Sequence, residues 1–139
     1  LLLQKIGNGV PLTLQIAQAV EEHGDLHLTE GYALELLPQD ISFLNDRFRD
    51  GKAYLPFTYF AGAAPENNYT PSLPYTVRVE SSHVSGEEPG YMKLFIPCGG
   101  ADAPRPIKLR QRGSDGKWFL WEQYLLTGVR TPKAADPWA

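Results

Sequence analysis

The chain has 139 residues, of which 42% are hydrophobic and 21% charged, and its formal net charge is −3 at pH 7. These values are typical of one globular domain, whereas a nucleic-acid-binding module normally has an excess of basic residues over the whole domain. The 13 Gly and 12 Pro favour turns over long helices, no apolar stretch is long enough to span a bilayer, and the single cysteine, Cys98, excludes an intrachain disulfide framework.

The first residue is Leu1 rather than Met, so we expect the chain to be the C-terminal part of a longer or processed product. We expect residues 1–139 to form a single α+β domain, because a chain of this length can bury roughly two thirds of its unfolded surface in one core. The composition leaves the cellular compartment open.

A short amphipathic helix is predicted near the start of the chain. Pro11 suits a first helical turn, Gly24 suits a left-handed cap, and apolar residues recur at helical spacing between them. Segments 26–29 and 32–37 then flank a Glu-Gly turn and predict a hairpin. The second segment also contains helix formers, so an extended helix is the alternative.

A second short helix is predicted after the hairpin. Asp40 supplies an acidic first turn, Ile41, Leu44 and Phe48 share one face, and Gly51 ends the segment.

The aromatic run from Tyr54 to Phe60 changes the apolar period to 2 and predicts an extended strand. Pro56 has no N–H to donate, so this strand is expected at a sheet edge or with a bulge. Residues 61–74 have turn chemistry throughout and predict a long connection that is either mobile or functional. Alternating apolar residues then predict an antiparallel pair of strands at 75–80 and 91–96.

The last predicted hairpin has one apolar face and one basic, aromatic face. The residues expected in the core are Ile107, Leu109, Trp118 and Leu120. The residues expected on the other face are Lys108, Arg110, Arg112, Phe119 and Trp121. A cation over an exposed indole ring contributes about 0.5 to 1 kcal/mol, so this face could bind a partner. The alternative is that the first helix covers the face and makes its aromatics ordinary core.

The order of these elements predicts an α+β fold: a bent, mainly antiparallel sheet packed against two or three short helices, with a C-terminal β-meander. This architecture resembles the NTF2-like and cystatin-like folds, in which a curved sheet wraps a helix and often encloses a pocket. The resemblance implies isomerases, dehydratases, secretion components or immunity proteins, and does not choose among them.

A closer resemblance begins at the turn Gly99-Gly100-Ala101-Asp102-Ala103-Pro104-Arg105-Pro106 and ends at Gly128-Val129-Arg130. It is similar to an uncharacterised family of bacterial domains that carry a Gly-Ala-Asp-x-Pro-Arg-Pro turn and a closing Gly-Val-Arg element. The match covers about 35 residues, with a looser match back to the second helix. The resemblance implies no activity, cofactor or catalytic residue.

Charge is segregated along the chain. Residues 1–103 hold 6 Lys or Arg against 13 Asp or Glu, whereas residues 104–133 hold 7 against 2. The basic end could attract an acidic protein partner, or the acidic part of the same chain could neutralise it. We expect no nucleic-acid or membrane partner, and the sequence leaves the oligomeric state open.

Arg105 in the turn and Arg130 in the closing element are candidate anchors. Pro104 and Pro106 restrict the backbone around Arg105, whose planar fork could grip Asp102 or Glu122, and Arg130 could form a second clamp. Each could lock the turn or bind a partner carboxylate or phosphate. The candidate partner-binding residues are Arg105, Arg110, Arg112, Trp121, Arg130 and Asp102.

Enzymatic sites have weak support in the sequence. Possible zinc ligands gather near the first helix: His23, His27, Glu22, Asp25 and Glu30. Gly24 separates the two histidines, and no His-Glu-x-x-His pattern is present. Cys98 with His83 could form a nucleophile and base, and Asp40, Asp46 or His27 could act in acid–base chemistry inside a pocket. No nucleotide-binding loop is present, so we expect no cofactor, no metal and no assigned catalytic residue.

The sequence therefore predicts a non-enzymatic protein–protein interaction module, in a secretion-associated, adaptor or immunity role in bacteria. The expected contact surfaces are the loop 61–74, the turn 99–105 and the basic, aromatic strand face. The alternative is small-ligand binding, or an acid–base enzyme that uses an NTF2-like pocket.

Overall fold

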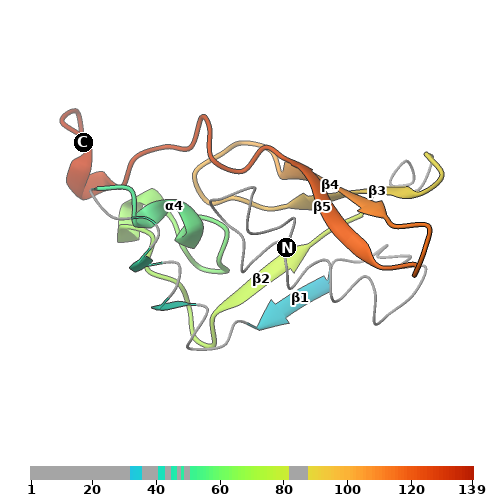
Figure 1. Cartoon of the computed structure of the whole chain (residues 1–139). Coiled ribbons are helices and arrows are strands. Elements are labelled where there is room, and N and C mark those ends of the chain that lie inside the picture. The colour runs from blue at the N-terminus through green and yellow to red at the C-terminus, as the bar shows by residue number, and fades with distance from the viewer. Residues whose placement is uncertain (1–31, 36–40, 43–44, 47, 49–50, 82–87) are drawn as a thin grey trace.

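The protein is a small α+β domain, seen here in a computed structural model that describes residues 32–35, 41–42, 45–46, 48, 51–81 and 88–139 (Figure 1). The predicted fold class is confirmed. The elements whose two ends both lie in described residues are β1 (Tyr32–Glu35), α4 (Tyr54–Phe57), the 3-10 helix η1 (Pro65–Asn67), β2 (Thr76–Val79), β3 (Tyr91–Ile96), β4 (Arg105–Gln111), β5 (Trp118–Gln123) and the 3-10 helix η2 (Lys133–Ala135).

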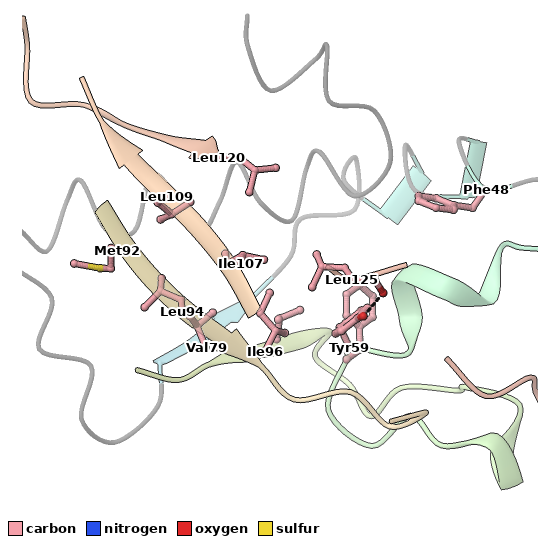
Figure 2. Packing of buried hydrophobic residues seen from close by; sticks show 12 residues of the cluster. Phe48, Tyr59, Val79, Met92, Leu94, Ile96, Ile107, Leu109, Leu120 and Leu125 are labelled. Carbon is pink, nitrogen blue, oxygen red and sulfur yellow. Dashed lines mark hydrogen bonds between the residues drawn. The ribbon is translucent and has the colours of Figure 1, made fainter. Parts of the chain in front are cut away.

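Strands β3, β4 and β5 form a three-stranded antiparallel meander, as the alternating sequence predicts. One face of this sheet is apolar and buried, and Figure 2 shows its side chains packed together. Its fully buried members are Leu94, Ile96, Ile107, Leu109 and Leu120. Trp118, also expected in the core, is half-buried and packs against the buried cluster. The alternation therefore places the opposite side chains of these strands on the outer face.

A second, two-stranded sheet pairs β1 with β2 in antiparallel register, with Leu34 opposite Val77. Val77 and Val79 of β2 are buried in the same core as the meander. The predicted pairing of 75–80 with 91–96 is wrong except at one bridge, where Glu80 and Phe95 exchange backbone hydrogen bonds of 2.7 and 2.8 Å. The partner of β2 is instead β1, a strand more than forty positions earlier in the chain.

The aromatic run 54–60 is not a strand, and this corrects the sequence prediction. Tyr54–Phe57 form the single helical turn α4, after which the Phe60 amide bonds the Phe57 carbonyl at 3.0 Å. Pro56 is compatible with this turn because the first amides of a helix have no intrahelical partner to lose. The turn buries Tyr59 and Phe60, so the aromatic residues still serve the core.

The connection 61–74 contains η1 and is held by its own hydrogen bonds. The Asn67 carboxamide oxygen accepts from the Ala64 and Thr70 amides, each at 3.0 Å, and its nitrogen donates to the Gly62 carbonyl at 2.8 Å. Figure 1 shows α4 and the C-terminal end gathered at one end of the molecule, away from the turn that joins β4 to β5.

Two predictions near the start of the chain concern residues that the structure describes. Tyr32–Glu35 is a strand, as the second arm of the predicted hairpin requires, and Ile41, Ser42, Asn45 and Asp46 are helical, as the second helix requires. The first helix and segment 26–29 lie outside the described residues. None of the helices in the described part of the chain has the length and hydropathy of a membrane span.

Candidate binding surface

The outer face of the β3–β4–β5 sheet carries cations and aromatic rings in contact with one another. We call it the cation–aromatic face, and it consists of Tyr91, Lys93, Lys108, Arg110, Arg112, Phe119 and Trp121. It forms because successive side chains of a strand point to opposite sides of the sheet. Met92, Leu94, Leu109 and Leu120 point into the core, so their neighbours in the sequence point outward. The register sets Arg110 of β4 opposite Tyr91 of β3 on one side and Phe119 of β5 on the other.

Arg110 lies at the centre of this face, over two aromatic rings. Its guanidinium carbon is 4.5 Å from the centroid of the Trp121 ring and 5.4 Å from that of Tyr91. The two rings meet edge to face, with 6.2 Å between their centroids. Among the described residues, none forms a hydrogen bond or ion pair with the Arg110 side chain. The guanidinium is therefore oriented by the rings while its N–H donors stay available.

A β-bulge in β5 lies at Trp121, which points outward because it directly follows buried Leu120. The register shifts between Lys108, which is opposite Glu122, and Leu109, which is opposite Leu120, so Trp121 is the extra residue. The bulge lets Trp121 and Glu122 both lie on the solvent side, and the Trp121 side chain is 43% exposed. Bulges commonly re-aim a side chain in this way.

Two other cations of this face, Lys108 and Arg112, are neutralised by carboxylates of the same chain. The Lys108 ammonium lies 2.7 Å from a Glu88 oxygen and 4.6 Å from the Tyr91 ring centroid. The hydrogen bond with Glu88 raises the pKa of Lys108. Arg112 forms an ion pair with Asp115, and the hydrogen bond from Arg112 lowers the pKa of that carboxyl to about 2.

Arg112 also stacks on an aromatic ring, with its guanidinium carbon 4.7 Å from the Phe119 centroid. The predicted placement of Arg110, Arg112 and Trp121 on one basic, aromatic face is therefore what the structure has. The described residues leave this face open, with both Trp121 and Arg110 exposed. The first helix, which was the alternative cover for the face, lies outside the described residues.

The glycine-rich turn forms a second, separate cluster, in which the predicted carboxylate clamp is made by Arg130 and not by Arg105. Asp102 pairs with Arg130 and not with Arg105, whose Nη2 donates to the Gly128 carbonyl at 2.9 Å. The reason is backbone geometry: the Arg130 amide bonds the Gly100 carbonyl at 2.9 Å, so the closing segment runs beside the turn. The predicted grip of Arg105 on Asp102 or Glu122 is wrong.

The two glycines at the start of this turn are needed for close packing. The Gly99 amide donates to the Thr58 carbonyl at 2.7 Å, and a methyl group at Gly99 would overlap the Ala63 carbonyl oxygen. A methyl group at Gly100 would overlap the hydroxyl of Tyr69. This part of the turn is therefore packed against the loop that follows α4.

An open pocket of about 600 Å³ lies next to the turn, beside η1 and η2. Its charged lining residues are of both signs: Glu66, Arg130, Lys133 and Asp136. The turn and this pocket are at the start of β4, whereas Arg110 is near its far end. The structure thus divides the six candidate binding residues into two groups: Arg110, Arg112 and Trp121 on the face, and Asp102, Arg105 and Arg130 at the turn.

Comparison with models of protein families shows to which family this chain belongs. The model of one family matches residues 14–133, and that family is described as Domain of unknown function (DUF6935). The chain belongs to this family. No curated protein and no solved structure matches it. The predicted kinship with an uncharacterised domain family is confirmed, whereas the likeness to NTF2-like and cystatin-like folds stays a prediction.

Some candidate catalytic and metal-binding residues of this DUF6935 domain lie outside the described residues, and others lie within them. His23, His27, His83 and Asp40 lie outside the described residues, so the zinc, Cys98–His83 and acid–base hypotheses keep only their sequence support. Cys98 is half-buried, and its Sγ lies 3.5 Å from the Thr58 hydroxyl. Within residues 51–81, 88–139 and the short described segments before them, no three His, Cys, Asp or Glu side chains form a metal-binding group.

Proposed function

We propose that the domain is a non-enzymatic protein-binding module and that its binding surface is the cation–aromatic face. The observation that supports this most is Arg110, which two aromatic rings hold in place while its donors have no partner among the described residues. A side chain that is already oriented loses little conformational entropy when a partner binds.

The composition of the face supports a protein partner. Trp, Tyr and Arg are the residue types most enriched at the energetic centres of protein interfaces. Trp121 and Arg110 are both exposed, and Tyr91 supports them from the neighbouring strand. Neutralised pairs surround them, since Lys108 binds Glu88 and Arg112 binds Asp115. A central aromatic and arginine group inside a polar rim is the usual arrangement of such interfaces.

A secretion-associated, adaptor or immunity role in bacteria would each need such a surface, and these three roles stay predictions. The binding roles of Asp102, Arg105 and Arg130 also stay predictions. Their observed contacts are with the chain itself, because Arg130 bonds Asp102 and Arg105 bonds the Gly128 carbonyl.

Site-specific photo-crosslinking in the source cells tests the proposal. A photoreactive phenylalanine derivative would replace Trp121 in one variant and Trp138 in the other. Trp138 is 93% exposed and is the next-to-last residue. The C-terminal end lies away from the β3–β4–β5 sheet (Figure 1), so this position reports chance encounters. We expect a discrete protein adduct from position 121 alone. Equal adducts from both positions, or none from position 121, would contradict the proposal.

The pocket beside η1 and η2 supports a second candidate, the binding of a small ligand. Arg130 and Lys133 would meet an anionic group, while Glu66 and Asp136 would meet a cationic one. Native mass spectrometry of the purified protein tests this idea. A small molecule that remains bound to the wild type and is lost from Lys133→Gln would support the ligand site; a spectrum of the bare chain in both would count against it.

A further inference from the structure

We propose that the cation–aromatic face binds an extended acidic segment of a partner protein, in which two carboxylates two residues apart meet Arg110 and Lys93. This inference rests on the proposed function and adds the chemistry of the partner. It is carried by the two cations of this face that have no carboxylate partner among the described residues, and by their spacing on the sheet.

The face contains two kinds of cation. Lys108 and Arg112 each have a carboxylate partner in the chain, Glu88 and Asp115. Arg110 and Lys93 have no carboxylate partner among the described residues, and each lies over an aromatic ring. The Lys93 ammonium is 5.6 Å from the centroid of the Phe95 ring. The positive charge available to a partner is therefore concentrated at Arg110 and Lys93.

These two side chains leave the sheet at a spacing that matches an extended chain. Arg110 is directly opposite Tyr91, and Lys93 is two residues further along β3, so the pair is diagonal across neighbouring strands. Side chains in this relation are separated by about 7–8 Å at their origins. In an extended peptide, residues i and i+2 point the same way and are about 7 Å apart. A Glu-x-Glu segment that crosses the face can therefore place one carboxylate on each cation.

The same charges disfavour a nucleic acid as the partner. Glu88, Asp115 and Glu122 lie among the cations of the face, close to where a phosphate backbone would run. Protein surfaces that bind nucleic acids are instead predominantly basic, because the phosphates of a nucleic acid follow one another without interruption. Two separate carboxylates can meet Arg110 and Lys93 while avoiding these three acidic residues.

Titration of the whole chain with short peptides, followed by NMR, tests the inference. The probe is acetyl-Thr-Glu-Val-Glu-Thr-amide. One comparison peptide replaces both Glu by Gln, and another carries the two Glu in adjacent positions, where an extended backbone points them to opposite sides. We expect the Glu-x-Glu peptide to bind about fivefold more tightly than either comparison peptide, as for one or two exposed ion pairs.

Protein variants locate the site. Arg110→Gln and Lys93→Gln should each remove most of the preference for Glu-x-Glu, whereas Lys52→Gln should keep it. Lys52 is exposed and precedes α4, so this control removes one positive charge away from the face. Equal binding of all three peptides, no binding of any, or an equal loss in Lys52→Gln would overturn the inference.

Two further outcomes separate this inference from the proposed function. A protein adduct at position 121 together with no preference for the acidic peptide would overturn the acidic segment and leave the protein-binding role in place. A single-stranded oligonucleotide that binds more tightly than the Glu-x-Glu peptide, and loses affinity in Arg110→Gln, would overturn both.

Discussion

Tyr69 donates a hydrogen bond from its hydroxyl to the main-chain carbonyl of Arg130, with 2.6 Å between the two oxygens. Tyr59 makes the equivalent bond to the carbonyl of Leu125. Both tyrosines are buried, and they belong to the segment that contains α4 and η1. Two hydroxyls thus fasten the chain that follows β5 to the segment that contains α4 and η1, and this holds the glycine-rich turn in place.

The Tyr69→Phe variant tests this fastening. It removes the donor and leaves the Arg130 carbonyl without its tyrosine partner, which should lower the free energy of unfolding by about 1 to 2 kcal/mol. Tyr124→Phe is the matched control, because its hydroxyl meets Glu122 on the exposed surface. Urea denaturation of both variants provides the comparison. An equal effect of the two substitutions would show that the Tyr69 bond adds nothing.

Alkaline pH should weaken the same fastening. Burial raises the pKa of Tyr69 from its ordinary 10.0 to about 12, and burial also raises the pKa of Tyr59. A raised pKa means that the neutral hydroxyl stabilises the fold: its contribution is complete below about pH 10 and is lost as the pH rises through about 12. The urea midpoint should fall across this range, and less steeply in Tyr69→Phe. Parallel curves for the two proteins would refute this linkage.

The Gly99→Ala variant should be strongly destabilised. Its methyl group would overlap the Ala63 carbonyl oxygen, and such overpacking costs about 1 to 3 kcal/mol or more. Gly113→Ala is the control, since a methyl group there meets no atom within 4 Å. Thermal unfolding should show a lower Tm for Gly99→Ala only. A wild-type Tm for this variant would mean that the turn is packed differently.

Neighbouring residues of β5 should respond in opposite ways. Leu120 is 1% exposed, so Leu120→Ala should cost about 2 to 5 kcal/mol of unfolding free energy. Trp121 is 43% exposed, so Trp121→Ala should cost about 1 kcal/mol or less, chiefly through its contact with Arg110. Chemical denaturation measures both. A larger cost at Trp121 than at Leu120 would reverse the assignment of the two faces.

The C-terminal meander could be predicted because its signals are local. Leu94, Ile107 and Leu109 alternate with polar residues in strands joined by short connections, so inside and outside follow from the period. The cation–aromatic face follows from the same alternation. Trp121 also follows from this alternation, since it comes directly after buried Leu120. The outward position of Glu122 could not be derived in this way, because it depends on a bulge that has no turn residue to mark it.

Other features depend on contacts between distant parts of the chain. The pairing of β1 with β2 brings together segments separated by α4 and η1. The aromatic residues of 54–60 suit a strand in isolation, yet packing of Tyr59 and Phe60 favours a helical turn there. Arg130 reaches Asp102 only because the closing segment bonds Gly100. The β1–β2 pairing and the backbone bond between Arg130 and Gly100 leave no local pattern in the sequence.

The affinity of the crosslinked partner for the Trp121→Ala variant tests the central claim most directly. Trp138→Ala is the matched control, because it also removes an exposed indole but lies outside the cation–aromatic face. Loss of a central interface tryptophan typically weakens binding by about 2 kcal/mol or more, roughly thirtyfold. Calorimetry should show this loss for Trp121→Ala and an unchanged Kd for Trp138→Ala. An unchanged Kd for Trp121→Ala would contradict the binding role of the face.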